Sequence, residues 1–413
     1  MRARARRLFA ITLATTVVSV VSAAGLLNYL VDPYAIFGGR AIAGFNAIKP
    51  RPDAMLADIK FIVGTHARAD ALILGNSRAE VGFDPRHPAF AARGLHAFNA
   101  AVPGSDTAYT LEALERLNGA SRVDVAIIGI DFVDFLTRSD ASATPQSGLR
   151  DPWLARFLAL FSTTATLDSL RTIAIQHQKY PATLRTDGFN PMLDYIDIAA
   201  HQGYAVLFRQ RAEQGARSLA RAPHNLYAGE RGTSPALANL AAILDRARAE
   251  AMDVNLVMYP YHLLLLLQFD AAGLSPLLEQ WKRDVTTLAE SARTRGTRVT
   301  VWDFACPHPI TAERVPLAGD LRSDMRWYWE AGHFKKALGD VVLNKALAWN
   351  ALDTSPDFGV SLTAANIDQR ITHCRSALAV MRERFPGLAR EAEELANAAS
   401  GVESRARPIS ASR

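Results

Sequence analysis

A serine that follows an apolar run could act as a nucleophile in acyl transfer. Ser77 stands in the segment Gly-Asn-Ser-Arg, directly after the strand-like run Ala71 to Leu74. A tight turn at this point would expose the hydroxyl and aim backbone N–H groups at a developing oxyanion. The alternative is that Ser77 only caps a helix that begins near Arg78. Ser77 by itself leaves both interpretations open.

A Glu-x-x-His pair later in the chain could supply the base and the group that orients it. Glu330 and His333 follow the last strand-like run and open a helical pattern. The spacing lets the carboxylate accept from Nδ1 while Nε2 faces Ser77. The alternative is that His333 packs beneath the nearby aromatic side chains. Asp303 or Asp324 could also orient His333 in place of Glu330.

The elements that must position these residues form an alternating pattern. The strand-like runs are five: 71–74, 96–99, 123–130, 254–259 and 298–302. Because helical patterns separate most of them, we expect an α/β fold with a mainly parallel sheet of about five strands and flanking helices. Residues 135–234 break the rhythm, and we expect them to form a helical insertion beside the substrate. Ligands of such sheets meet the carboxyl ends of the strands, where Ser77 stands.

The first 31 residues indicate a membrane anchor. Residues 8–31 contain no charge over 24 positions, which is long enough to cross a bilayer, and four arginines precede them. A cleaved signal peptide is the alternative, although this apolar stretch exceeds a typical signal sequence. Either interpretation places residues 32–413 outside the cytoplasm.

Charge and cysteine content exclude several functions. Of the 46 basic residues four lie before residue 8, and the remaining 42 nearly balance 41 acidic ones, so nucleic acid is not an expected partner. Cys306 and Cys374 are too few for a disulfide scaffold, and they could pair or stay as free thiols. No metal-binding pattern or phosphate-binding loop is present, and we expect neither a metal nor a cofactor.

The two blocks resemble the first and last blocks of SGNH (GDSL-like) hydrolases. The segment Asn99 to Gly104 is similar to the family's glycine block, whose backbone N–H helps to form the oxyanion hole. Glu330 replaces the usual Asp, and Asp131 stands where the family has Asn. An ionised Asp131 cannot donate a hydrogen bond to an oxyanion. Asn76 could take its place.

More narrowly, the anchor and the block order resemble membrane-anchored SGNH-like proteins of bacterial envelope polysaccharide systems. The resemblance covers about residues 68–134 and 254–347, and it implies transfer or removal of acyl groups on a polysaccharide. Three further residues could contact substrate: Arg78, Asp131 and His262. For His262 the alternative is a histidine that begins a helix, and for Arg78 a solvated surface charge.

These inferences predict a domain order and a function. We expect a cytoplasmic leader (1–7), an anchor (8–31), a stalk with a lead-in helix (32–67), the SGNH-like domain (68–347), C-terminal helices (348–397) and a disordered tail (398–413). The expected function is that of an O-acyl esterase or O-acetyltransferase, held by the inner membrane with its domain in the periplasm or outside the cell. Expected partners are a polysaccharide or acyl donor, the bilayer, and a membrane protein that supplies acyl groups. The alternative is a non-catalytic carbohydrate-binding or assembly subunit.

Overall fold

The computed structural model describes residues 2–52, 54–138, 148–220, 224–228, 232–349 and 355–406. Its helices are α1 (Arg2–Val31), α2 (Leu56–Ala67), α3 (Ser77–Gly82), α4 (Pro88–Ala91), α5 (Thr107–Ala120), α6 (Pro152–Phe161), α7 (Thr163–Ala174), α8 (Leu193–Gln202), α9 (Tyr204–Leu219), α10 (Pro235–Ala249), α11 (Leu263–Ala271), α12 (Ser275–Thr294), α13 (Lys336–Ala346), α14 (Ile367–Arg384) and α15 (Pro386–Ala406). Two 3-10 turns are η1 (Phe132–Phe135) and η2 (Ile175–His177).

The strands are β1 (Ala71–Leu74), β2 (Ala97–Asn99), β3 (Val125–Ile130), β4 (Thr137–Arg138), β5 (His224–Asn225), β6 (Asp253–Met258), β7 (Arg298–Asp303), β8 (Tyr328–Glu330), β9 (His333–Phe334) and β10 (Val360–Leu362). Six of them form the main sheet in the order β10-β7-β6-β3-β1-β2, and only β10 is antiparallel. The predicted α/β class with a mostly parallel sheet and flanking helices is confirmed, with β10 as a strand that the sequence did not reveal.

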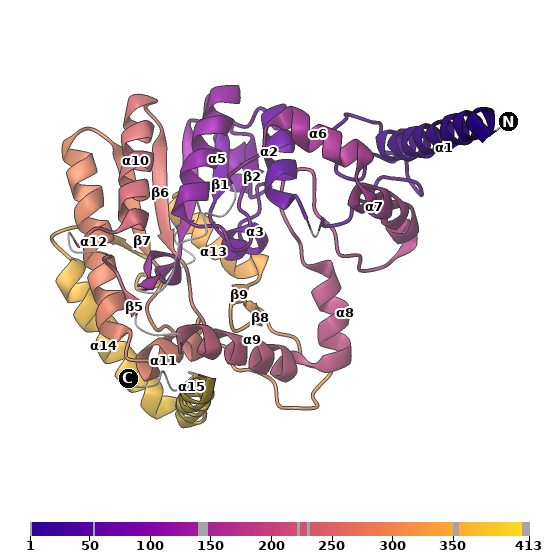
Figure 1. Ribbon diagram of the computed structural model, residues 1–413. Helices are drawn as coiled ribbons and strands as arrows, with labels where there is room; N and C mark the ends of the chain where they lie inside the picture. The colour runs from indigo at the N-terminus through magenta and orange to yellow at the C-terminus, as the bar shows by residue number, and fades with distance from the viewer. Residues whose placement is uncertain are drawn as a thin grey trace, which may run out of the picture.

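Burial explains why the central strands read as continuous apolar runs. Every residue of β1 and β3 is buried, as expected when helices cover both faces of a parallel sheet. Helices α5, α10 and α12 pack side by side, and α10 and α12 also contact the sheet (Figure 1). The parallel arrangement brings the carboxyl ends of β1, β3, β6 and β7 to one edge.

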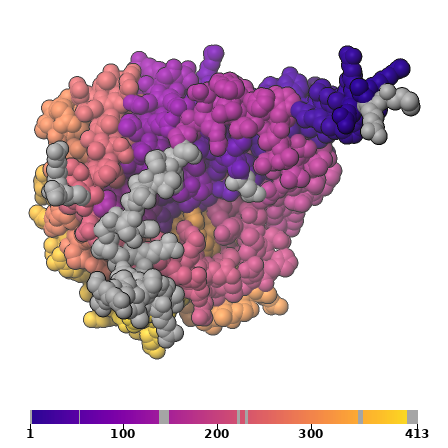
Figure 2. Space-filling view, viewed as in Figure 1, coloured from indigo at the N-terminus to yellow at the C-terminus, as the bar shows by residue number. Residues whose placement is uncertain are grey.

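The insertion divides into two parts with different neighbours. Helices α6 and α7 pack against α1, whereas α9 packs against β8, α11 and α15 (Figure 1). Helix α1 is long and apolar enough to span a membrane, and it protrudes from the body as the indigo helix in Figure 2. Helix α9 of the second part therefore approaches the predicted site, because β8 carries Glu330.

Residues 32–52, which we expected to form a stalk, pack in part against the rest of the protein. Tyr34 and Ile36 are buried, and Lys49 Nζ donates to the backbone oxygen of Asp32 at 2.6 Å. Pro50 forms an isolated antiparallel β-bridge with Thr183 of the insertion. This packing joins the end of α1 rigidly to the domain.

The chain remains helical beyond the point where we expected a disordered tail. Helix α15 continues to Ala406, so residues 398–406 correct that prediction, and residues 407–413 lie outside the described part of the chain. Alanines, which favour helix without needing an apolar period, explain the difference. Three of the six residues from Leu395 to Ser400 are alanine.

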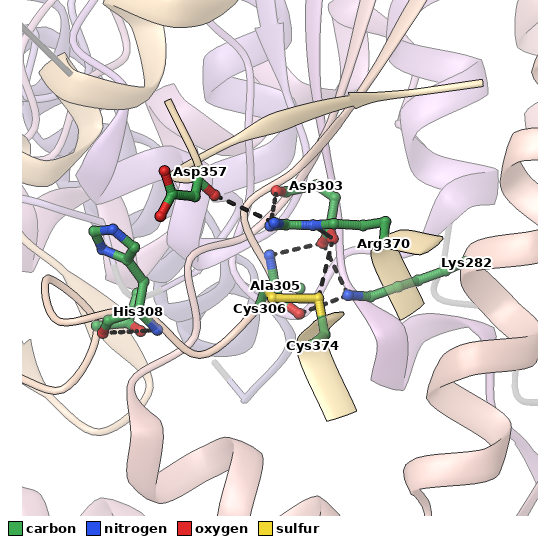
Figure 3. Close-up of a disulfide and its surroundings, with 9 residues drawn as sticks. Lys282, Asp303, Ala305, Cys306, His308, Asp357, Arg370 and Cys374 are labelled. Carbon is green, nitrogen blue, oxygen red and sulfur yellow. Dashed lines mark hydrogen bonds and ion pairs between the residues drawn. A yellow bond between two sulfur atoms is a disulfide. The ribbon is translucent and has the colours of Figure 1, made fainter. Parts of the chain in front are cut away.

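A disulfide and a buried charge cluster fasten α14 to the end of β7. Cys306 and Cys374 are bonded, with a Cα–Cα distance of 5.2 Å, which resolves the alternative left open by the sequence (Figure 3). Beside them Asp303 is fully buried and pairs with Lys282 at 2.9 Å and Arg370 at 2.8 Å. Burial alone would raise the pKa of Asp303, but the two cations hold it below its usual value.

The substitution Asp303→Asn should destabilise the fold by about 3–5 kcal/mol, because it leaves two buried cations without their counter-charge. Thermal unfolding of the full chain in detergent measures this effect. Asp368→Asn is the control, since Asp368 pairs with Arg283 at an exposed site and should matter little. Equal unfolding temperatures for the two variants would contradict the structural role of Asp303.

Candidate active site

Ser77 is presented by a tight turn between β1 and α3. Gly75 has a φ of +129°, and a Cβ at this position would lie 2.5 Å from the Tyr259 hydroxyl and 2.8 Å from the Gly129 carbonyl oxygen. Only glycine fits this turn. Asn76 caps α3 by accepting from the Arg78 N–H at 3.1 Å, so Ser77 is the first helical residue. The Ser77 hydroxyl is therefore fixed at the carboxyl edge of the sheet. The residue that caps α3 is Asn76, not Ser77.

Glu330 and His333 lie opposite each other in a hairpin. They pair across the antiparallel strands β8 and β9, with Ala331 and Gly332 as the connecting turn. We expected His333 to open a helix, but α13 begins only at Lys336. The three-residue spacing nevertheless serves the predicted purpose, because directly opposed residues of a hairpin have neighbouring side chains.

The hairpin brings His333 to Ser77 across 256 residues of sequence. His333 Nε2 lies 2.7 Å from Ser77 Oγ, and His333 Nδ1 is hydrogen bonded to Glu330 Oε1. The imidazole thus stands between a hydroxyl and a carboxylate, in the order that a nucleophile, a base and an orienting group require. Ser77 and His333 are partly exposed, while Glu330 is buried. A substrate could reach the first two without contacting the third.

Several contacts keep Glu330 ionised. Burial alone would raise the pKa of this carboxyl, but His333 and Arg211, together with the Gly332 N–H, hold it below its usual value. Gly332 N–H donates to Oε2 at 2.6 Å, and Arg211 Nε lies 3.8 Å from the same oxygen. Arg211 belongs to α9 of the insertion, and nothing in the sequence pattern indicated its role.

The two alternative orienting residues do not contact His333. Asp303 forms ion pairs with Lys282 and Arg370, as described above. Asp324 accepts from Tyr204 Oη at 2.5 Å and from Lys335 Nζ at 2.8 Å. Among the described residues, Glu330 is therefore the carboxylate that contacts His333 Nδ1.

The polar groups beside Ser77 are engaged with one another. Asp131 is fully buried and ion-paired with Arg78, and it accepts from Tyr261 Oη at 2.8 Å. The Asn76 amide donates to Asp131 at 2.9 Å and to Asp134 at 3.1 Å. Both N–H groups of this amide are thus used.

This network corrects two sequence-based assignments, those of Asn76 and Asp131, and excludes one alternative, that for Arg78. Asn76 has no amide hydrogen left for an oxyanion, so it does not substitute for the family's asparagine. Asp131 serves as an acceptor of internal hydrogen bonds and is closed to substrate. Arg78 is not a solvated surface charge, since its guanidinium pairs with Asp131 and lies 5.4 Å from the centre of the Tyr261 ring. The sequence missed the network because its partners come from different strand ends.

The loop that carries Gly104 adjoins the turn before Ser77. Val102 N–H and Ser105 Oγ both donate to the Gly75 carbonyl oxygen, at 3.0 and 2.9 Å. Gly104 itself is exposed and has a φ of +69°. The loop is thus fixed beside the turn that presents Ser77.

His262 is not open to substrate, contrary to its assignment as a substrate contact. It is fully buried at the start of α11, where Nδ1 accepts from the Leu264 N–H at 3.2 Å and Nε2 lies 2.9 Å from the Glu313 carbonyl oxygen. Burial lowers its pKa to about 4, which keeps the ring neutral. The alternative of a helix-start histidine is the one that the structure shows.

Buried polar residues that the sequence did not single out fix the position of α3. Glu80, one turn after Ser77, lies 3.2 Å from the fully buried Lys60 Nζ, which also donates to the Ala101 carbonyl oxygen at 2.5 Å. The Asn99 amide donates to the carbonyl oxygens of Ala79 and Phe83, both at 2.9 Å. The asparagine of the glycine-like block therefore holds the helix that presents Ser77.

A cavity of about 270 Å³ opens beside the hairpin. Its polar lining includes Arg78, Arg211, Gln214 and Gln268, and its apolar lining includes Leu265 and Phe269. Such a mixed lining suits part of a sugar or an acyl chain. Within the described residues, no group of three or more His, Cys, Asp or Glu side chains is placed to hold a metal ion.

Comparison with known proteins gives no family for this chain: no family model and no curated protein matches it. The argument on function therefore depends on the site geometry and on the resemblance of the short blocks.

The Asp134 carboxyl should make stability depend on pH near neutrality. Burial raises its pKa to about 7, although Arg78 and Asn76 oppose the shift. A raised carboxyl pKa favours the folded state at low pH, and this contribution is lost as the pH rises from about 4 through 7. The Asp134→Asn variant should therefore have a higher melting temperature than the parent protein at pH 8, but not at pH 5.

The control is Asp245→Asn, which changes an exposed carboxylate on α10. Its difference from the parent should be the same at both pH values. An Asp134→Asn difference that is likewise constant would show that Asp134 ionises normally.

Proposed function

We propose that this protein is an exported, membrane-tethered serine acyl-transfer enzyme of the SGNH type. The observation that carries the proposal is the chain of contacts from Ser77 Oγ through His333 to Glu330. Each member comes from a separate loop or strand of a rigid core, and a fully buried carboxylate would be costly to keep without a use for its charge. The short blocks that resemble SGNH hydrolases support the same assignment.

In the proposed mechanism, Ser77 Oγ attacks an ester carbonyl carbon while His333 Nε2 takes the hydroxyl proton. The carbonyl oxygen becomes an oxyanion, which then re-forms the double bond and expels the alcohol, and His333 returns the proton to this alcohol. The acyl group is left on Ser77. A water molecule or a sugar hydroxyl attacks the acyl carbon next, while His333 takes its proton. The bond between the acyl group and Ser77 Oγ then breaks, His333 returns the proton to Oγ, and the product is either a free acid or a new ester.

Oxyanion stabilisation is assigned to backbone donors, because the side chains of Asn76 and Asp131 are engaged elsewhere. The Ser77 N–H stands at the start of α3, where helix N–H groups point outward. The loop of Gly104 is the second element that the resemblance assigns to this task. Backbone donors of this kind are sufficient in many acyl-transfer enzymes.

For the substrate we propose an acylated or acyl-accepting polysaccharide of the bacterial envelope, with a membrane protein as a source of acyl groups in the transferase case. Support comes from the resemblance and from α1, which is apolar enough to anchor the domain in the inner membrane. The arginines in the first turns of α1, before its uncharged stretch, favour a cytoplasmic N-terminus, so the domain would face the periplasm.

A non-catalytic, carbohydrate-binding subunit is the second candidate. It is favoured by one observation, namely that the Asn76 amide and the Asp131 carboxylate are locked in a network with Arg78 and cannot serve an oxyanion. In that case the triad geometry would persist without turnover.

Hydrolysis of p-nitrophenyl acetate by the full chain in detergent distinguishes the two candidates. Ser77→Ala should lower kcat by at least about 10⁴-fold, since it removes the nucleophile. Ser121→Ala is the matched control, because Ser121 also stands in a Gly-x-Ser segment but lies at the end of α5. Activity that is equally low in the parent and both variants would favour the non-catalytic subunit.

The substitution Glu330→Gln should slow acylation by about 10³ to 10⁴-fold without loss of fold, because the imidazolium loses its counter-charge and its tautomer is no longer fixed. Glu330→Asp should cost less, since it retains the charge. Single-turnover release of p-nitrophenol measures the step, and circular dichroism checks the fold. A fully active Glu330→Gln variant would remove Glu330 from the mechanism and leave the pair of Ser77 and His333.

A further inference from the structure

Helices α6 and α7 form a pair with apolar side chains turned outward. Every fourth residue of α6 is a large exposed aromatic, and the side chain of Trp153 is 67% exposed. Helix α7 exposes an aliphatic residue at every third position, of which Leu167 is 65% exposed. The exposed stripes comprise Trp153, Phe157, Phe161, Leu167, Leu170 and Ile173. A soluble surface seldom gathers so many apolar side chains in one place.

The opposite faces of the two helices are satisfied within the protein. Ala155, Ala159 and Ala165 pack in a small core with Tyr34 and Ile36. Tyr34 Oη also donates to Asp168 at 2.7 Å. The outward stripes are therefore not the result of a poorly packed helix pair, because each helix has one well-packed face and one apolar exposed face.

The pair is locked to the last turns of α1. The fully buried Asn28 amide donates to the Leu160 carbonyl oxygen at 2.8 Å and to Thr166 Oγ1 at 3.1 Å, and it accepts from Ser169 Oγ at 2.8 Å. A Cβ at Gly25 would lie 2.6 Å from the Phe161 ring. Figure 1 shows α6 and α7 at the end of α1 that meets the body. The exposed stripes are thus continuous with the apolar surface of α1.

The length of α1 indicates the depth in the bilayer at which α6 and α7 contact it. The uncharged stretch of α1 measures about 36 Å at 1.5 Å per residue, and a bilayer hydrocarbon core is about 30 Å thick. If the N-terminal end of this stretch lies at one boundary of the core, Gly25 to Val31 lie at the other. Helices α6 and α7 contact α1 at this boundary. Amphipathic helices lie at such a depth, and tryptophan is enriched there.

We propose that the α6–α7 pair is a second membrane contact, whose apolar stripes are buried among the phospholipids of the leaflet that faces the catalytic domain. The proposal rests on the membrane anchoring proposed above. Because residues 32–52 pack in part against the rest of the protein, the two contacts together fix the height and tilt of the domain over the bilayer. The Ser77 site is then held at a fixed height over the bilayer and does not move freely on a tether.

Spin labelling of the full chain tests this proposal. Cys306 and Cys374 are bonded to each other, so an introduced cysteine is the single free thiol. A nitroxide is placed in separate variants at Phe157→Cys and Leu167→Cys, and the protein is reconstituted in nanodiscs of phosphatidylethanolamine and phosphatidylglycerol. Collision rates with oxygen, which concentrates in lipid, and with a water-soluble nickel chelate are then compared.

Two control positions calibrate the measurement. Val380→Cys labels an apolar residue that is 61% exposed on α14, far along the chain from the anchor, and it should report water. Val18→Cys labels the middle of α1 and should report the bilayer interior. The labels at positions 157 and 167 should favour oxygen at least about tenfold more than the label at position 380, and they should lie shallower than the label at position 18.

Labels at 157 and 167 that match the one at 380 would overturn the proposal while leaving the anchor intact. Labels shielded from both reagents and broadened by spin–spin coupling would also overturn it, since a second copy of the chain would then cover the stripes. A label at position 18 that reports water would contradict the proposal that α1 is a membrane anchor, and with it the proposed membrane contact of α6 and α7. None of these results depends on esterase activity, so failure here is distinguishable from failure of the proposed chemistry.

Discussion

The hydrogen bond between His333 Nε2 and Ser77 Oγ is the contact on which the proposed chemistry depends. It joins the loop after β1 to a hairpin far along the sequence, and neither partner could hold the other in place by itself. A displacement of about 1 Å at such a contact is enough to lose orders of magnitude in rate. Much of the polar structure around the site can be understood as a means to keep this distance.

Rigid supports reach both partners. On the serine side, the buried Lys60 and Glu80 pair and the Asn99 amide fix α3. On the histidine side, the Tyr328 hydroxyl donates to the Pro260 carbonyl oxygen at 2.9 Å, and Arg211 adds a charge beside Glu330. The two sides meet directly where α13 packs on α3, at a position where Gly339 has no room for a Cβ beside the Gly82 carbonyl oxygen. The site is therefore built into the core.

The sequence predicted those parts that local patterns encode. Ser77, Glu330 and His333 stand in short motifs next to strand-like runs, and the parallel sheet follows from the alternation of strands and helices. It did not predict the hairpin of β8 and β9, because strands of two or three residues show no period. It also missed Arg211, Lys60 and the network of Asn76 with Asp131. Their partners lie far apart in the sequence, and only the folded chain brings them together.

The central claim is that Ser77 is an activated nucleophile, and covalent trapping tests it most directly. A fluorophosphonate loses fluoride when an activated serine attacks its phosphorus, so the mass of the adduct and its position can both be measured. The full chain in detergent should gain one adduct, mapped by peptide mass spectrometry to Ser77, and His333→Ala should lose it with the fold intact. No adduct on the native protein, or an adduct on another serine that persists in Ser77→Ala, would contradict the account.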